Sequence, residues 1–196
     1  IVGFGEVQMG WPEIAFKVRF TGGVWRGRRL NPMKGFQGRP TTDFGREGLF
    51  NLLRTRVDLE GAQVLDLFSG TGMVGMECAS RGAAFVTSVE KQNKACRYIK
   101  EQYKNLDYDN ILVVCNDSFG FMRRAYTPYD FVFADPPYNM DKFESIPGLV
   151  KDSGLVAQGG LFVLEHGERI AFGGADGFVE CRKFGHVHFS FFTFEP

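Results

Sequence analysis

Residues 131–138 read FVFADPPY, an apolar run that ends in a carboxylate, two prolines and an aromatic ring. The apolar half is rich in β-branched and aromatic residues, which is typical of a strand buried on both faces. Pro136 and Pro137 have no N–H to give to a neighbouring strand, so the chain leaves the sheet there. Open α/β sheets bind ligands at the carboxyl ends of their strands. The stretch therefore predicts either a site for a planar amine, built from Asp135, the Pro136 carbonyl and the Tyr138 ring, or an ordinary turn with a capping aspartate.

A strand–turn–helix pattern repeats on both sides of this stretch. The predicted strands are residues 63–67, 84–89, 111–115, 129–134 and 160–165, and the predicted helices are residues 43–57, 73–80, 91–106, 118–125 and 141–152, the last interrupted near Pro147. Such alternation indicates a parallel sheet with helices on both faces. Residues 178–184 and 186–194 meet at Gly185 and alternate in polarity, which predicts a closing antiparallel hairpin. The expected fold is therefore α/β and mostly parallel.

The turn after the first of these strands is rich in glycine. Gly70, Gly72 and Gly75 match the G-x-G-x-x-G spacing of dinucleotide-binding proteins, and Glu90 lies where a ribose-binding acid is expected. That fingerprint places its glycines directly after the strand, whereas a segment beginning at Asp66 intervenes here. The Asp66 carboxylate would also repel a diphosphate. A nicotinamide-dependent oxidoreductase is therefore kept only as an alternative.

Acidic side chains follow four successive predicted strands. They are Asp66, Glu90, Asp117 and Asp135. S-adenosylmethionine suits this set because it has no phosphate, its sulfonium and ammonium are positive, and its ribose offers two hydroxyls to Glu90. Asp117 follows the third strand, where an adenine amino group is expected. Each acid alone is explained by helix capping or surface charge, but the ordered set predicts a nucleoside-type cofactor.

Charge is placed unevenly along the 196-residue chain, although its formal net charge is zero. Residues 17–39 carry seven basic side chains and no acidic one. Residues 14–20 and 24–30 flank Thr21-Gly22-Gly23 and predict a β-hairpin. We therefore divide the chain into an N-terminal hairpin and linker, residues 14–40, and a main domain, residues 41–196.

The basic hairpin predicts contact with a polyanion, and a solvated hairpin face is the alternative. Trp25 lies among the arginines, where it suits stacking on RNA bases or anchors the hairpin to the body. The residues expected to contact RNA are Trp25, Arg26, Arg28, Arg29, Lys34 and Arg39.

The cysteines and histidines give no metal-site pattern. The cysteines are widely spaced, without a C-x-x-C pair, at Cys78, Cys96, Cys115 and Cys181. This spacing predicts buried free thiols in a cytoplasmic protein, rather than a zinc site or a disulfide framework. His186 and His188 form an i, i+2 pair without a third ligand, so no metal is expected. His166 follows the fifth strand, either near the substrate or in a surface or capping role. No apolar run approaches the ~18 residues of a membrane span.

Several motifs together resemble class I methyltransferases. They are residues 66–72 (DLFSGTG), residues 80–83 (SRGA), Glu90 and residues 135–138 (DPPY). Three N-terminal segments narrow the resemblance to the RsmD-like bacterial guanine-N2 methyltransferases of 16S ribosomal RNA. These segments are residues 27–30 (GRRL), 39–42 (RPTT) and 47–51 (EGLFN). Within the last segment, Gly48 stands where Ala or another helix former is expected.

The resemblance implies a seven-stranded Rossmann-like fold, S-adenosylmethionine as methyl donor, and a guanine of the assembled or assembling small ribosomal subunit as substrate. We also expect a monomer without a metal. The expected catalytic residues are Asp135, Pro136 and Tyr138. The expected cofactor-binding residues are Thr41, Asp66, Phe68, Ser69, Gly70, Thr71, Gly72, Glu90, Lys91, Asp117 and Ser118. The alternatives are an amino methyltransferase acting on DNA adenine or a protein amide, and a non-catalytic RNA-binding protein with this fold.

Overall fold

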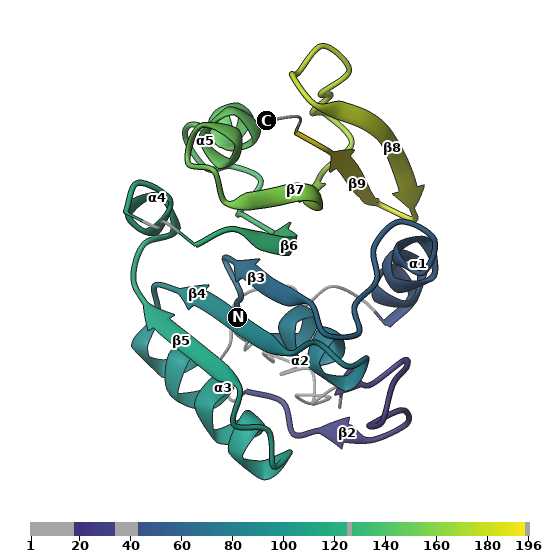
Figure 1. Ribbon diagram of the computed structural model, residues 1–196, viewed down its shortest axis with the longest axis vertical. Coiled ribbons are helices and arrows are strands. Elements are labelled where there is room, and N and C mark those ends of the chain that lie inside the picture. Colours follow the sequence, from purple (N-terminus) through teal and green to yellow (C-terminus); the bar gives the residue numbers. More distant parts are fainter. Residues whose placement is uncertain (1–17, 34–42, 125–126, 195–196) are drawn as a thin grey trace, which may run out of the picture.

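A seven-stranded sheet forms the centre of the molecule (Figure 1). The computed structural model describes residues 18–33, 43–124 and 127–194. The strand order is β5-β4-β3-β6-β7-β9-β8, in which the first five strands are parallel and β9 runs antiparallel to β7 and β8. The strands are β3 (Gln63–Leu67), β4 (Phe85–Glu90), β5 (Ile111–Cys115), β6 (Tyr129–Ala134), β7 (Val156–His166), β8 (Phe178–Phe184) and β9 (Val187–Phe192). The predicted Rossmann-like sheet with a closing antiparallel hairpin is therefore confirmed.

Helices cover both faces of this sheet because successive strand residues point to opposite sides. The helices are α1 (Asp43–Leu53), α2 (Met73–Ser80), α3 (Asn93–Asn105), α4 (Ser118–Met122) and α5 (Ile146–Asp152), with a 3₁₀ turn, η1 (Phe143–Ser145), before the last. Phe131 and Phe133 of β6 enter one core, with residues of α1, α2 and α3. Val132 and Ala134 enter the other, with residues of α4, η1 and α5. The central strand is thus buried on both faces, as its sequence predicted.

Three predicted helices differ from the structure by more than two residues or are divided, and the helix predicted over 91–106 spans Asn93–Asn105. The first helix ends at Leu53 rather than at residue 57. Beyond this point the Leu52 carbonyl accepts a hydrogen bond from the Arg56 guanidinium at 2.8 Å, in place of the backbone N–H that a longer helix would supply. The helix predicted over 118–125 ends at Met122. The helix predicted over 141–152 is divided into η1 and α5, with Pro147 in the first turn of α5, where a missing N–H costs little.

Gly48 is explained by close packing between α1 and β8. A Cβ atom on this residue would lie 2.3 Å from ring atoms of Phe184. The absence of a side chain at this position lets the helix approach the aromatic ring. The lower helix propensity of glycine is therefore offset by a contact that no larger residue allows in this packing.

The predicted N-terminal hairpin exists, but its turn is in a different place. β1 (Val18–Arg19) pairs antiparallel with β2 (Arg29–Leu30), and the chain turns at residues 24–27. The prediction of a turn at Thr21-Gly22-Gly23 is wrong because these residues bind a helix instead. Thr21 and Gly22 donate backbone N–H groups to the Glu77 carboxylate of α2, at 3.0 and 2.7 Å. Residues 14–17 and the linker 34–40 lie outside the described residues.

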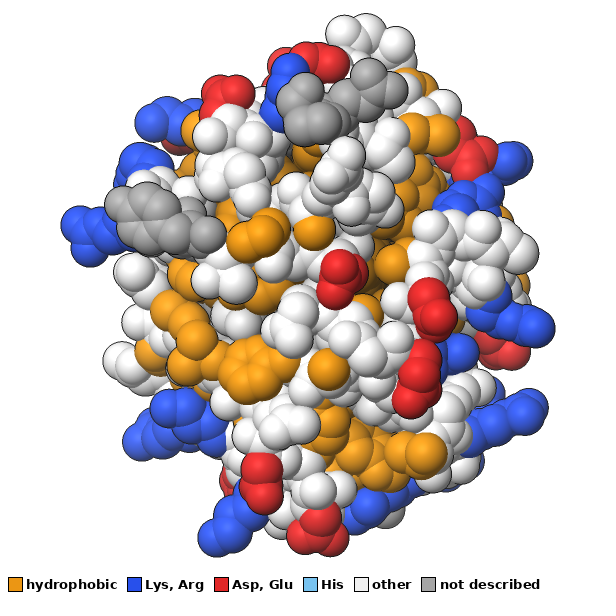
Figure 2. Space-filling view, in the orientation of Figure 1, with side chains coloured by type: hydrophobic (Ala, Val, Ile, Leu, Met, Phe, Trp, Pro, Cys, Tyr) orange, Lys and Arg blue, Asp and Glu red, His pale blue; other side chains and the backbone are white. Residues whose placement is uncertain are grey.

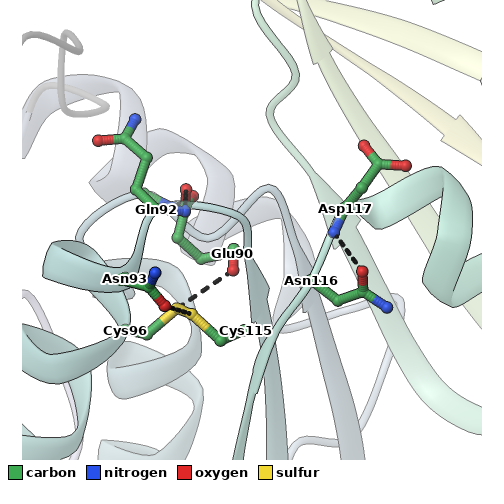
Figure 3. Close-up of a disulfide and its surroundings, with 8 residues drawn as sticks. Glu90, Gln92, Asn93, Cys96, Cys115, Asn116 and Asp117 are labelled. Carbon is green, nitrogen blue, oxygen red and sulfur yellow. Dashed lines mark hydrogen bonds between the residues drawn. A yellow bond between two sulfur atoms is a disulfide. The ribbon is translucent and has the colours of Figure 1, made fainter.

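The predicted pattern of free thiols is half correct. Cys78 is buried and free, whereas Cys181 is free but exposed. Cys96 of α3 and Cys115 at the end of β5 form a disulfide, with Cα atoms 6.0 Å apart (Figure 3). The two cysteines are 19 residues apart, so their pairing is not evident from the sequence. Cys96 lies near the start of α3, and β5 then runs back beside β4, so that its last residue, Cys115, returns to the start of α3. Among the described residues, no helix is long and apolar enough to cross a membrane.

Candidate active site

The carboxyl ends of the parallel strands surround a cavity of about 600 Å³. Turns after β3, β4, β5 and β6 contribute to its wall, together with the end of β7, Phe44 of α1 and the β8–β9 turn. The predicted site residues that line it are Asp66, Phe68, Ser69, Gly70, Thr71, Glu90, Lys91, Asp117, Ser118, Asp135, Pro136 and Tyr138. The structure thus brings both expected groups, cofactor-binding and catalytic, to one cavity. Thr41 lies outside the described residues.

The glycines after β3 shape the turn and admit the helix that follows. Gly72 adopts φ +73° at the start of α2, a conformation that favours glycine. A Cβ atom on Gly75 would lie 3.0 Å from Val86 and 3.2 Å from the Asp66 carboxylate. Close packing of α2 on the sheet therefore accounts for the last glycine of the G-x-G-x-x-G pattern without a pyrophosphate.

Glu90, at the end of β4, is held by backbone groups on both sides. Its Oε2 accepts the Gly70 N–H at 2.9 Å, and its Oε1 accepts the Gln92 N–H at 2.8 Å. Figure 3 shows it above the disulfide, near the edge where Asp117 follows β5. A carboxylate oxygen can accept about two hydrogen bonds, so both oxygens of Glu90 have capacity for a ligand in the cavity. This orientation suits a pair of ribose hydroxyls.

Asp66 is the most deeply buried acid of the cofactor side, at 2% exposure. Its Oδ2 accepts the Gly75 N–H at 3.2 Å. Burial, and then the negative charge of Glu90, raise the pKa of Asp66 to about 7. A buried carboxylate with so little compensation is stabilised by a cation in the cavity. A ligand with an ammonium or a sulfonium group would supply such a charge.

Asp117 and Ser118 divide two roles at the start of α4. Asp117 caps the helix, because its Oδ2 accepts the Gly120 N–H at 2.9 Å. Ser118 instead accepts the Phe68 N–H at 3.3 Å and so holds the turn after β3. Phe68 itself has φ +56°, an unusual conformation for a non-glycine residue. Residues in strained backbone conformations are often found at binding sites. Here the conformation of Phe68 directs the chain along the cavity wall.

The substrate side contains an acid that the sequence reading missed. Glu165 of β7 lines the cavity with Asp135, and it is 3% exposed. Tyr138 donates its hydroxyl to the Glu165 Oε1 at 3.2 Å, and the residue is 44% exposed. Burial, the Glu165 charge and the Asp66 charge raise the pKa of Asp135 well above its usual range. Glu165 ends a predicted strand like the other acids, so the strand-end rule applied to the fifth strand would have found it.

The expected RNA-binding residues lie away from this cavity. Arg26, Arg28 and Arg29 are exposed, and Arg28 donates to the Asn105 carbonyl at the end of α3, at 2.7 Å. Trp25 is half-buried, and its ring meets those of Phe20 and Tyr108 edge-on, with centroids 5.4 and 5.9 Å away. This packing supports the anchoring interpretation of the tryptophan. Lys34 and Arg39 lie outside the described residues.

The histidines do not form a metal site in the described part of the chain, where no group of three or more metal-ligating side chains occurs. His166 is buried, with Nε2 2.8 Å from the Ser190 hydroxyl and Nδ1 2.9 Å from the Gly167 carbonyl. Its role is thus internal. His186, in the β8–β9 turn, lines the cavity.

Comparison with known proteins identifies the family. A family model described as conserved hypothetical protein 95 matches residues 18–193. The chain is 37% identical, over 150 residues, to the ribosomal RNA small subunit methyltransferase D of Escherichia coli K12, covering 76% of this chain and 74% of that protein. It is also 31% identical over 157 residues to the putative rRNA methyltransferase YlbH of Bacillus subtilis, and this match covers 78% of this chain and 84% of that protein. The structure is similar to that of the putative methyltransferase yhhF from Escherichia coli, with a TM-score of 0.78 and 32% identity over 90% of this chain and 97% of that chain. The chain therefore belongs to the ribosomal RNA small subunit methyltransferase D family, as its motifs indicated.

Proposed function

We propose that this protein transfers a methyl group from S-adenosylmethionine to the exocyclic N2 amine of a guanine in small-subunit ribosomal RNA. The observation that carries the proposal is the convergence of four strand-end acids, Asp66, Glu90, Asp117 and Asp135, on one cavity beside Tyr138. The names of the relatives specify ribosomal RNA of the small subunit as the substrate class, rather than DNA or protein.

The cofactor side of the cavity fits S-adenosylmethionine by its chemistry. Asp66 offers a buried negative charge to the cationic methionine part, and Glu90 offers fixed acceptors to the ribose hydroxyls. Asp117, which precedes α4 and lines the cavity, suits the adenine amino group as a hydrogen-bond acceptor. When bound, S-adenosylmethionine supplies a methyl group activated by the adjacent sulfonium. The residues of this chain then have to position the amine that receives it.

Positioning falls to the residues after β6. The N2 amine of guanine is a poor nucleophile because its lone pair is delocalised into the ring. The Asp135 carboxylate and the Pro136 carbonyl each accept one N–H of that amine, which favours a pyramidal nitrogen with its lone pair directed at the methyl carbon. The Tyr138 ring stacks on the base after it leaves its RNA context. Methyl transfer is then a displacement in which orientation and electrostatics dominate.

The proton released in the reaction has a nearby acceptor. The methylated amine is acidic and gives up one N–H proton after the C–N bond has formed. The raised pKa of Asp135 makes its carboxylate a better proton acceptor than an ordinary aspartate. No strong base is needed before the transfer, so Asp135 acts first as an orienting acceptor and afterwards takes the proton.

The N-terminal hairpin supplies the proposed contact with the ribosomal subunit. Its exposed side chains Arg26, Arg28 and Arg29 add positive charge, and Figure 2 shows Lys and Arg side chains, with Asp and Glu side chains among them, along the lower edge of this face. Such charges hold the RNA phosphates without reading the sequence. The acidic cavity then receives the base.

A labelling assay tests the proposal. The protein is incubated with methyl-labelled S-adenosylmethionine and, separately, with unmethylated small subunits, naked rRNA, duplex DNA and total protein. We expect label in small-subunit RNA, recovered as N2-methylguanine. Asp135→Ala is expected to lower turnover by about 10²–10³-fold, the range for removing one oriented polar group, with little loss of cofactor affinity.

Three results would contradict the proposal in different ways. Label in DNA or protein would keep the chemistry and change the substrate. Cofactor binding without label in any acceptor would favour a non-catalytic RNA-binding protein. Near-normal turnover of Asp135→Ala would contradict the mechanism alone.

A further inference from the structure

We propose that Glu165 recognises the N1–H of the target guanine and so makes the enzyme specific for guanine over bases that carry an acceptor at N1. The inference rests on the proposed function, because it assigns a second contact to the same base. Neither the motifs nor the comparisons assign a role to this residue. The proposed contact is additional to those of the DPPY segment, residues 135–138, which provides the two acceptors for the N2 amine.

The topology places Glu165 next to Asp135. β6 and β7 are parallel, with Ala134 opposite Leu164, so the two acids are the next residues along adjacent strands. Ala134 and Leu164 both enter the core on the α5 side of the sheet, and the acids that follow them line the cavity together. Glu165 is therefore held at the substrate side of the cavity by the sheet itself rather than by a loop.

A hydrogen bond holds the Glu165 carboxylate beside the ring that is proposed to stack on the base. Tyr138, whose ring is expected to stack on the base, donates its hydroxyl to Oε1 at 3.2 Å. The same ring passes close to Gly167, where a Cβ atom would lie 3.1 Å from a ring carbon. A carboxylate has about four acceptor positions, so one group can bind both a tyrosine hydroxyl and a base. The hydrogen bond thus fixes the position of the Glu165 carboxylate relative to the Tyr138 ring.

Guanine has the edge that this arrangement requires. Its N1–H and its two N2–H groups are three adjacent donors, whereas adenine has an acceptor at N1. Three residues with acceptors line the cavity where the neighbouring strands β6 and β7 end: Pro136 with its carbonyl, and Asp135 and Glu165 with their carboxylates. A base with an N1 lone pair would face the Glu165 carboxylate without a proton between them. Such mismatches discriminate strongly because a buried polar group is left unpaired.

The alternative is that Glu165 only holds Tyr138 in place. The two roles differ in what they predict for 2-aminopurine, which keeps the N2 amine and the ring but has an acceptor at N1. A purely structural Glu165 would affect guanine and 2-aminopurine equally. An acid that reads N1–H would affect them in opposite directions when it is changed to an amide, since the amide can donate to the N1 acceptor.

The experiment compares the two bases at one position. The methylated nucleotide is first located in small-subunit RNA by primer extension, and 2-aminopurine is then placed there by ligation of RNA fragments. We expect the wild type to methylate guanine faster than 2-aminopurine in kcat/KM by about 10- to 100-fold, the range for one hydrogen bond to a charged group. In Glu165→Gln the preference is expected to fall by a similar factor or to reverse.

Two further variants separate the roles. Glu168→Gln makes the same chemical change at an exposed acid paired with Lys183, and it is expected to keep the wild-type preference. Tyr138→Phe removes the hydroxyl that Glu165 accepts but keeps the ring. It is expected to lower both rates together without changing their ratio.

The outcomes are distinguishable. Equal losses on both bases in Glu165→Gln, or the same change of preference in Tyr138→Phe, would overturn the inference and leave the proposed function standing. A wild type that places no label on guanine N2 would overturn both. Thermal unfolding of each variant shows whether a lost rate reflects a lost fold.

Discussion

Two buried acids on neighbouring elements of this molecule differ in what surrounds them. Glu77, in α2, is fully buried and accepts hydrogen bonds from the Thr21 and Gly22 backbone, the Thr21 hydroxyl and the Arg81 guanidinium. Arg46 of α1, also fully buried, lies 3.7 Å from it. Asp66, at the end of β3, is 2% exposed and accepts the Gly75 N–H.

The difference indicates that Glu77 serves the fold, and it supports the proposed role of Asp66 toward a ligand. Burying a carboxylate is costly unless donors and positive charges compensate for it. At Glu77 two arginines and the N-terminal hairpin provide this compensation, so the acid joins the hairpin to α1 and α2. At Asp66 the cost is expressed as a pKa of about 7, and the missing charge has to come from the cavity. Both acids are buried, and only their partners distinguish them.

The largest expected effect is on the fold, from Glu77→Gln. The substitution removes the negative charge that Arg46 and Arg81 share, and breaking one partner of a buried ion pair costs about 3–5 kcal/mol. We expect the free energy of unfolding in urea to fall by that amount. We also expect trypsin to cleave faster at the hairpin arginines, residues 26–29, because the hairpin loses its attachment to α2.

The matched control is Glu101→Gln, an exposed acid on α3 that is expected to change stability by less than about 0.5 kcal/mol. A Glu77→Gln protein as stable as this control would show that the hairpin is not held by the acid. Glu77 could then not be regarded as an acid that serves the fold.

Asp66→Asn is expected to have the opposite sign on stability. The neutral amide keeps an acceptor for the Gly75 N–H and removes a buried charge that the free protein does not compensate. A shift from 3.8 to about 7 corresponds to up to about 4 kcal/mol at pH 8, by which the variant is expected to exceed the wild type in free energy of unfolding. The same variant is expected to lose about 10- to 100-fold in S-adenosylmethionine affinity, measured by calorimetry, because an ion pair is lost. A variant that is less stable than the wild type would mean that Asp66 is a structural acid like Glu77.

Much of this arrangement could be predicted from the sequence because it depends on local rules. The strands over residues 63–67, 111–115 and 129–134 have the predicted bounds, since apolar β-branched runs with sharp ends form buried strands. The parallel topology followed from their alternation with helices, and it placed the strand-end acids in one cavity. Family motifs then specified the chemistry.

The features that escaped prediction depend on tertiary contacts. The hairpin turn moved because Thr21 and Gly22 bind Glu77, a residue 55 positions away from Gly22 in the chain. The Cys96–Cys115 disulfide depends on a crossover that returns the chain to the same edge of the sheet. Glu165 has no place in the sequence motifs, which end at Tyr138; its position at the end of a predicted strand was the available signal, whereas its hydrogen bond with Tyr138 is visible only in space.

The smallest expected effect is the pH dependence of cofactor binding, and it tests the functional half of the comparison most directly. In the free protein the pKa of Asp66 is about 7, above its value of 3.8 in the unfolded chain. The folded state therefore favours the protonated acid, and this contribution to stability is fully present below about pH 4 and is lost as the pH rises to 7. Binding of a cationic ligand has the opposite preference, because the ligand stabilises the carboxylate.

The affinity for S-adenosylmethionine is therefore expected to rise by about tenfold from pH 5.5 to 7.5, with release of a proton that calorimetry in two buffers of different ionisation enthalpy detects. In Asp66→Asn both the slope and the released proton are expected to disappear. An unchanged slope in that variant would assign the titration to another acid of the cavity, of which Asp135 is the first to consider because its pKa is also raised by burial. A flat profile in the wild type would mean that the ligand does not place its positive charge beside Asp66, and the buried acid would then need another explanation.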